Sequence, residues 1–317
     1  MDKSDKHIIA ERNIGLDYFK IFLSLLVVTI HLPPLFDSAI LHSFISNGIA
    51  RIAVPSFFII SGYYFYPKIG DTKACRKYIL RLLILSIVWI IIYFPLFFYP
   101  MDSFSIRGFL LVSIFGYGHL WYITASIISI SLIFVSKKII KNDFIIFFIA
   151  LAFFLIALYL MYGNGVNVNE FNIYRFRNGL CFGFVFTSIG CLINSKQWVK
   201  KIKEKHLLFM IFLFSILFLA ESLLRHEFLS TPFHDLYLTS ILLAPILLIY
   251  IFKHPIKKAG ANFIGVLSVG IYFIHYYVIE FVPILFDGYI RFIIVVLISV
   301  GLSYILYLIN KRINIFF

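Results

Sequence analysis

Residues 14–32 read IGLDYFKIFLSLLVVTIHL, an apolar segment long enough to cross a bilayer that nevertheless carries charged side chains. Because one turn of an α-helix takes about 3.6 residues, four polar side chains fall on one face of this helix. They are Asp17, Lys20, Ser24 and His31. A charged side chain in the hydrocarbon costs about 2.5–3.5 kcal/mol on insertion scales. The stripe therefore predicts a polar site inside a bundle of helices.

The composition of the whole chain is that of a protein with many membrane spans. Its 317 residues are 62% hydrophobic and 14% charged, with a mean hydropathy of +0.97, well above a soluble globular domain. We predict an all-α membrane protein with a single transmembrane domain over residues 1–317 and about ten helices. The expected spans are residues 14–32, 45–66, 78–99, 117–135, 143–162, 178–194, 207–224, 235–252, 262–285 and 290–309.

The basic residues alternate between the two sides of these spans. Of the 28 Lys and Arg residues, 21 lie in the two terminal tails and in loops 67–81, 136–142, 195–206 and 253–261, which share one side. Cytoplasmic loops carry the excess of Lys and Arg, so we predict that both termini are cytoplasmic. The net charge of +13 is then a topology signal, and we expect no nucleic-acid partner.

Other classes of site leave no trace in the sequence. It contains no phosphate-binding or dinucleotide-binding glycine motif, and its three cysteines have no zinc or disulfide spacing. We therefore expect no metal and no permanently bound cofactor. Any chemistry must take place inside the bundle.

Sorting the intramembrane polar residues by depth gives two clusters. The outer cluster contains His31, Arg51, His119, Arg177, Asn178 and Glu280, with Trp121 beside it and His275 near mid-depth. The inner cluster contains Asp17, Lys20, Ser61, Arg76, Lys77 and Arg81. This layout suits a reaction whose donor enters from the cytoplasm and whose acceptor waits outside. It suits a transport path equally well.

Structural explanations compete with the functional ones. A membrane histidine such as His119 or His275 is often a hydrogen-bond partner between helices, and Arg51 at a helix end can extend to the headgroups. Asp17 and Lys20 are spaced as a structural ion pair. The basic residues of loop 67–81 also serve as topology anchors. His31 is the residue that structure explains least, because it extends the polar stripe to the helix end.

Five segments resemble acyltransferase family 3, the integral-membrane acyltransferases that modify bacterial surface glycans. They are GLDYFKIFLSLLVVTIH (15–31), RIAVPSFFIISGYYF (51–65), GHLWYITA (118–125), RNGLCFGFVFTSIG (177–190) and VGIYFIHYYVI (269–279). They follow the family's order over residues 12 to about 280. Two features depart from the family pattern. Lys20 stands where arginine is usual, and the family's R-x-x-R motif becomes RKYILR (76–81).

The resemblance implies an integral-membrane O-acetyltransferase of the bacterial cytoplasmic (inner) membrane. Its donor would be acetyl-CoA and its acceptor a hydroxyl of a surface polysaccharide or lipid-linked sugar precursor; oligomeric state stays open. His31 would be the general base, with Asp17 orienting Lys20 and His119 beside the reacting groups. The expected donor-binding residues are Lys20, Ser61, Arg76, Lys77 and Arg81. The expected acceptor-binding residues are Arg51, Trp121, Arg177, Asn178, His275 and Glu280.

A membrane carrier is the alternative. The similar branch of the family also includes the membrane part of a serine racemase, which resembles a serine carrier. This sequence has no racemase domain and no internal repeat of the kind that many carriers show. Its polar groups fall at two depths rather than at one midplane level. These features favour the enzyme.

Overall fold

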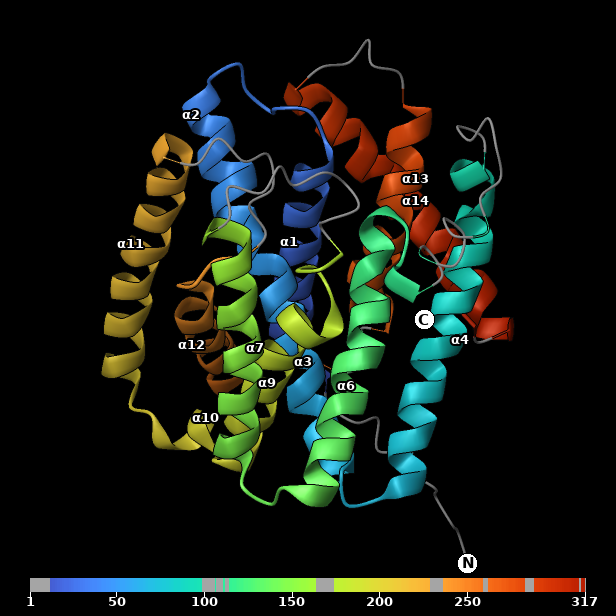
Figure 1. Ribbon diagram of the computed structural model, residues 1–317. Helices are drawn as coiled ribbons and strands as arrows, with labels where there is room; N and C mark the ends of the chain where they lie inside the picture. The colour runs from blue at the N-terminus through green and yellow to red at the C-terminus, as the bar shows by residue number, and fades with distance from the viewer. Residues whose placement is uncertain are drawn as a thin grey trace, which may run out of the picture.

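The protein is a bundle of long helices whose axes run mostly parallel to the vertical axis of Figure 1. The computed structural model describes residues 12–98, 106, 111, 114–163, 174–228, 236–258, 262–282, 288–313 and 315–316. Within these ranges, eight helices are long and apolar enough to cross a membrane, and two shorter apolar helices accompany them. These ten segments match the ten predicted spans and confirm the all-α membrane fold. Residues 99, 235 and 283–285 of the predicted spans lie outside the described residues.

The first part of the chain places three long helices and a series of short ones. In order they are β1 (Arg12–Asn13), α1 (Ile14–His31), α2 (Ala39–His42), the π-helix η1 (Ser43–Gly48), the 3₁₀-helix η2 (Ile49–Ile52), α3 (Ala53–Phe65), the 3₁₀-helix η3 (Tyr66–Lys68) and α4 (Thr72–Phe98).

The second part continues the bundle around the same interior. In order its elements are the 3₁₀-helix η4 (Gly118–Leu120), α6 (Trp121–Ile139), α7 (Asp143–Gly163), the π-helix η5 (Gly179–Gly183), α9 (Phe184–Ser195), α10 (Trp198–Lys201), α11 (Glu204–Phe228), α12 (Ser240–Lys253), β2 (Lys257–Lys258), α13 (Asn262–Phe281) and α14 (Gly288–Ile313).

Helix α1 has a defined start and a defined end. Asn13 caps its first turn by accepting a hydrogen bond from the backbone N–H of Leu16 at 3.2 Å. The chain before it, β1, pairs antiparallel with β2, with Arg12 opposite Lys258. At the other end the backbone turns extended at Leu32, directly before two prolines, so His31 is the last helical residue.

Helices α3 and α9 cross at the centre of the bundle, and two glycines allow their close approach (Figure 1). A Cβ atom on Gly62 would lie 2.0 Å from the carbonyl oxygen of Thr187, and one on Gly190 would lie 2.1 Å from that of Ile59. Small residues of this kind let membrane helices pack backbone to backbone. The contact fixes α3, which carries Ser61, against the second part of the chain.

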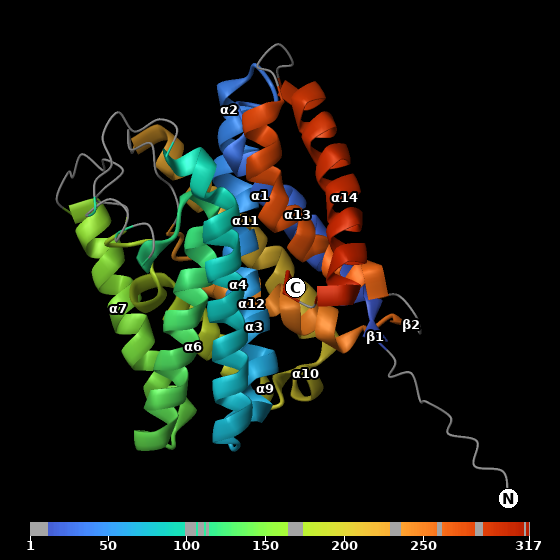
Figure 2. The ribbon, with the colours of Figure 1, turned by 90° about the vertical axis from the view of Figure 1, so that its right-hand side faces the viewer.

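Helix α13 packs between α1 and α4. The Ser24 hydroxyl of α1 donates to the backbone carbonyl of Ser268 at 2.9 Å. On the other side, the Tyr93 hydroxyl of α4 donates to the carbonyl of Phe273 at 2.7 Å, and Trp89 stacks on the Phe273 ring at 4.5 Å between centroids. Helix α13 packs against both α1 and α14, and Figure 2 shows α4 and α6 to the left of α13. The interior of the bundle is thus enclosed by α1, α3, α4, α6 and α13.

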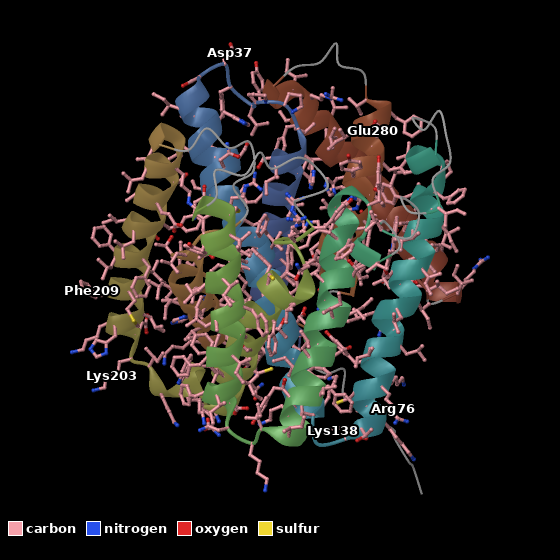
Figure 3. The ribbon with its side chains drawn as sticks, viewed as in Figure 1. Asp37, Arg76, Lys138, Lys203, Phe209 and Glu280 are labelled. Carbon is pink, nitrogen blue, oxygen red and sulfur yellow. The ribbon has the colours of Figure 1, made fainter. Side chains whose placement is uncertain are left out.

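Charged residues separate between the two ends of the bundle. In Figure 3, Arg76, Lys138 and Lys203 lie at one end, whereas Asp37 and Glu280 lie at the other. This arrangement agrees with the alternation of basic loops in the sequence. That the basic end faces the cytoplasm stays a prediction from the positive-inside rule.

Helix α4 begins six residues earlier than the predicted span. Asp71 accepts hydrogen bonds from the backbone N–H groups of Lys73 and Ala74 at 2.8 and 3.2 Å, which starts the helix at Thr72 instead of residue 78. Arg76 and Lys77, which precede the predicted span, therefore stand on the helix, as does Arg81 within that span. All three are exposed.

Candidate active site

A pocket of about 490 Å³, here called the outer pocket, collects most of the predicted outer cluster. It is lined by Val27, Ile30, His31, Arg51, Val54, His119, Trp121, Tyr122, Arg177, Phe182 and Tyr272. Two histidines, two arginines and a tryptophan of the predicted site thus face one space. They come from segments separated by up to 146 positions, between His31 and Arg177.

These polar side chains reach the pocket because each stands at the end of a helix or in a short irregular one. His31 is the last residue of α1, Arg51 lies in the 3₁₀-helix η2, and His119 lies in the 3₁₀-helix η4. Arg177 comes directly before Asn178, the residue that begins η5. Irregular backbone at membrane depth is tolerated where it lines a cavity. The outer pocket is built from such segments.

Three imidazole rings gather beside the pocket. The ring centroid of His31 lies 5.4 Å from that of His275 and 6.3 Å from that of His119, and the latter two are 4.9 Å apart. His119 and His275 are buried, at 1% and 0% exposure, whereas His31 is half-buried. Among the residues that the structure describes, no group of three His, Cys, Asp or Glu side chains is arranged to hold a metal ion. The cluster thus brings three imidazole rings together beside the outer pocket.

His275 stands behind His31 with a defined tautomer. Its Nδ1 atom lies 2.7 Å from the carbonyl oxygen of Tyr272 and 3.1 Å from that of Ile271. Since carbonyl oxygens only accept, Nδ1 carries a proton. Its buried Nε2 makes no hydrogen bond to the described residues. In the neutral ring, Nε2 keeps its lone pair. The centroid of the His275 ring lies 5.4 Å from that of the His31 ring.

The two arginines of the pocket are held in different ways. Arg51 donates from Nε to the carbonyl of Ser46 and from Nη2 to the side-chain oxygen of Asn47, both at 3.1 Å. Arg177 lies over the Trp121 ring, with its guanidinium carbon 5.4 Å from the ring centroid. Both contacts restrict a flexible cation. The outer pocket thus presents two oriented positive groups beside His31.

Three predicted acceptor-binding residues do not line the outer pocket: His275, which lies behind His31, and Asn178 and Glu280, which lie elsewhere. Asn178 caps η5: its side-chain oxygen accepts from the N–H groups of Leu180 and Cys181 at 2.9 and 2.8 Å, and its amide donates to two backbone carbonyls. Its side chain is thus used to begin the helix that follows Arg177. Glu280 is exposed near the end of α13, away from the basic end of the bundle (Figure 3).

A second pocket of about 770 Å³, here called the inner pocket, brings Lys20 and Ser61 together. It is lined by Lys20, Phe57, Ile60, Ser61, Leu82, Leu85, Tyr122, Ile123, Ser126, Ser268, Val269, Tyr272 and Phe273. These residues come from the regular faces of α1, α3, α4, α6 and α13, and most of them are apolar. The inner pocket is a largely apolar space with one cation in its wall.

Asp17 lies about one turn before Lys20 on α1 and pairs with two cations. Its buried carboxylate contacts Lys20 Nζ at 2.7 Å and also accepts a hydrogen bond from Arg12. Arg12 is a residue that sequence reasoning missed, because it lies in the N-terminal tail and counts there as a topology signal. No spacing rule would have found it, since it precedes the helix and folds back across its first turn. Two cationic partners offset the desolvation cost of a buried carboxylate better than a single partner does.

Arg76, Lys77 and Arg81 line neither of the two pockets. All three are exposed on the first turns of α4. The same helix contributes Leu82 and Leu85 to the inner pocket, so Arg81 directly precedes a residue of the pocket wall. The basic group therefore stands on the helix that leads into the inner pocket.

The two pockets share two side chains, Tyr122 and Tyr272, and sequence reasoning named neither. Their ring centroids are 5.6 Å apart, in an edge-to-face arrangement. Both stand inside quoted motifs, Tyr122 in GHLWYITA and Tyr272 in GIYFIH. The helical period could have identified Tyr272, because it lies three positions before His275 and thus on the same face of α13.

Comparison with known proteins defines the class. The fold is that of a multi-pass membrane protein, and the acyltransferase domain family, Acyl_transf_3, matches residues 13–308, nearly the whole chain. The chain belongs to this family, which confirms the resemblance found in its five motifs. No solved structure matches the chain.

Similar curated proteins carry a different name. An amino-acid racemase of Enterococcus faecalis is 27% identical over 95% of this chain and 47% of its own length. A serine/alanine racemase of Enterococcus gallinarum is 27% identical over 92% of this chain and 45% of its own length. The chain thus spans about half the length of the curated relatives it matches.

Proposed function

We propose that this membrane acyltransferase moves an acetyl group from cytoplasmic acetyl-CoA to a hydroxyl of a surface-polysaccharide or lipid-linked sugar precursor. It would act in the bacterial cytoplasmic membrane. The observation that carries the proposal is the pair of adjoining pockets. One is largely apolar with Lys20 in its wall, the other holds His31 and two arginines, and the two share side chains. A transferase that joins a donor from one face to an acceptor from the other needs such a passage.

The inner pocket suits the thin arm of coenzyme A. The phosphates of the donor would stay at the exposed basic group of α4, namely Arg76, Lys77 and Arg81. The arm would pass Leu82 and Leu85 and then Lys20 and Ser61 in the inner pocket. Lys20 and His31 are eleven positions apart on α1, about 16 Å along its axis, a distance that a long arm is needed to cover. Asp17 would keep the Lys20 ammonium in place.

The chemistry would take place at His31. Its imidazole takes the proton of the acceptor hydroxyl as the oxygen attacks the thioester carbonyl. The tetrahedral intermediate carries a negative oxygen, which Arg51 and Arg177 would stabilise across the pocket. Collapse of the intermediate breaks the carbon–sulfur bond and releases the coenzyme A thiolate, which takes the proton back from the histidine. His275 would stand behind His31 with its Nε2 lone pair available to the imidazolium.

A carrier for an amino acid is the second candidate, and the names of the relatives favour it. Two similar proteins are called racemases of amino acids, serine and alanine among them. A membrane unit that supplies such an enzyme would bind its substrate at one site with alternating access. The distribution of polar groups over two pockets of different chemistry supports the transferase instead.

Purified protein in liposomes separates the two functions. Acetyl-CoA is supplied on one side, with a polyprenyl-diphosphate-linked N-acetylglucosamine probe in the bilayer, and thiol release and acetylated lipid are measured. The same liposomes are tested for uptake of radiolabelled L-serine. We expect coupled thiol release and acetyl transfer without serine uptake. Serine uptake without thioester cleavage would overturn the transferase.

A further inference from the structure

We propose that Tyr122 and Tyr272 restrict the transferred acyl group to a short chain. This inference rests on the proposed function and deepens it, since it assigns the acyl-length specificity to two residues of the passage. The two aromatic rings stand where the inner and outer pockets meet, and both pockets include them. Any group that travels from Lys20 to His31 must pass these rings.

The two rings are in direct contact. Edge-to-face aromatic pairs have centroids about 4.5–7 Å apart, and this pair lies at 5.6 Å with an interplanar angle of 74°. The two side chains thus touch each other where the two pockets meet. A thioester carbonyl can reach the outer pocket only when one ring turns aside, and the opening is then of the order of one ring.

Tyr272 is the fixed member of the pair. Its side chain is buried, and its hydroxyl donates to the backbone carbonyl of His119. Its ring also packs edge to face against His119, with centroids 5.2 Å apart. These contacts connect α13 to the start of α6. Movement of Tyr272 would therefore disturb the histidine cluster itself.

Tyr122 is the less buried member of the pair. It is half-buried, and its hydroxyl is paired with the Ser61 hydroxyl at 3.3 Å, near the upper limit for such a bond. Its ring packs against Phe58 and Phe57, with centroids 4.8 and 5.9 Å away. Turning the ring toward the inner pocket, which Phe57 and Ser61 also line, would break the Ser61 contact and part of this aromatic packing.

This geometry limits the length of the acyl chain. With the thioester carbonyl at His31, the atoms beyond it must lie in the outer pocket, because the coenzyme A arm fills the passage between the two tyrosines. The acceptor hydroxyl must occupy the same outer pocket, beside His31, Arg51 and Arg177. An acetyl group adds one methyl there. Each further methylene competes with the acceptor for this space, and a misfitting methylene costs about tenfold or more in kcat/KM.

The test compares acetyl-CoA with butyryl-CoA as donor to the polyprenyl-diphosphate-linked N-acetylglucosamine probe. For wild-type protein we expect kcat/KM to favour acetyl by about tenfold or more. Tyr122→Ala removes the ring and joins the two pockets, so we expect that preference to fall by about tenfold. Tyr122→Phe keeps the ring and loses only the Ser61 contact, so the preference should stay within about twofold of wild type.

The controls keep the result interpretable. Tyr159→Ala removes a tyrosine that is 71% exposed on α7, and we expect it to leave the acyl preference unchanged. If Tyr122→Ala is not recovered as folded protein, Tyr122→Leu shortens the ring while preserving apolar packing, and the same loss of preference is expected. If wild type and Tyr122→Ala prefer acetyl-CoA over butyryl-CoA by the same factor, the role of the tyrosines is overturned. The proposed transferase function then stays intact. Absence of any acyl transfer by wild type overturns the proposed function itself.

Discussion

The outer and inner pockets of this protein are built in opposite ways. The outer pocket takes its polar residues from the end of α1, from η2 and η4, and from Arg177 just before η5. The inner pocket is lined by the regular faces of long helices, and its wall is mostly apolar. Two sites a few side chains apart therefore differ in both chemistry and backbone.

The difference follows from where a membrane bundle tolerates polarity. In the middle of a long helix every backbone group is satisfied within the helix, and apolar side chains can pack without cost. At helix ends the chain changes direction, so side chains from distant segments converge and backbone groups become available to hold them. Asn178 at the start of η5 and Ser46 beside Arg51 show this use of backbone and side chain together. Reactive groups are thus concentrated where helices end, and the passage runs where they are regular.

The largest expected effect tests the outer pocket at its centre. His31→Ala should lower kcat for acetyl transfer by about 10²–10⁴-fold, because the acceptor hydroxyl loses its general base. The measurement is acetyl transfer by purified protein whose folding is verified by its melting temperature. His206→Ala, at an exposed histidine near the start of α11, is the matched control and should retain activity. Wild-type kcat in the His31 variant would remove this residue from the mechanism.

The next effect separates chemistry from binding in the same pocket. Arg177→Ala should lower kcat by about 10²–10³-fold, as removal of an oxyanion-stabilising donor does in known sites. Its neighbour Arg175 is exposed, and Arg175→Ala supplies a control of the same charge two positions away. Steady-state kinetics with acetyl-CoA resolve kcat from KM. Equal kinetics in the two variants would assign Arg177 to packing on Trp121 instead.

The smallest effect lies at the entrance to the inner pocket. Neutralising Arg76, Lys77 and Arg81 together should raise the KM for acetyl-CoA by about tenfold with little change in kcat, since exposed ion pairs each contribute about 0.2–1 kcal/mol. The effect should shrink at high salt. A control variant neutralises three lysines of another basic segment, namely Lys200, Lys201 and Lys203. It removes the same charge and is expected to leave KM unchanged. An equal rise in both variants would mean that overall charge, not this helix, attracts the donor.

Much of the fold could be predicted from the sequence because membrane insertion depends on local properties. Hydropathy located ten apolar segments, and the structure places helices on all of them. The start of α4 was predicted six residues too late, because Asp71 begins a helix in a region that hydropathy treats as loop. Periodicity within 14–32 placed Asp17, Lys20 and His31 on one face, and the Asp17–Lys20 contact was foreseen from the spacing alone.

What the sequence by itself determined is therefore the list of spans, the polar stripe of the first one and, through five motifs in order, the family. Only the tertiary structure decided which polar residues share a space. It placed Arg51 and Arg177 beside His31, turned Asn178 into a helix cap, added Arg12 to Asp17, and set Tyr122 against Tyr272 between two pockets. The physical reason is that hydropathy and helical period act within one segment. Convergence at a site depends instead on how far each helix extends and where it ends against its neighbours.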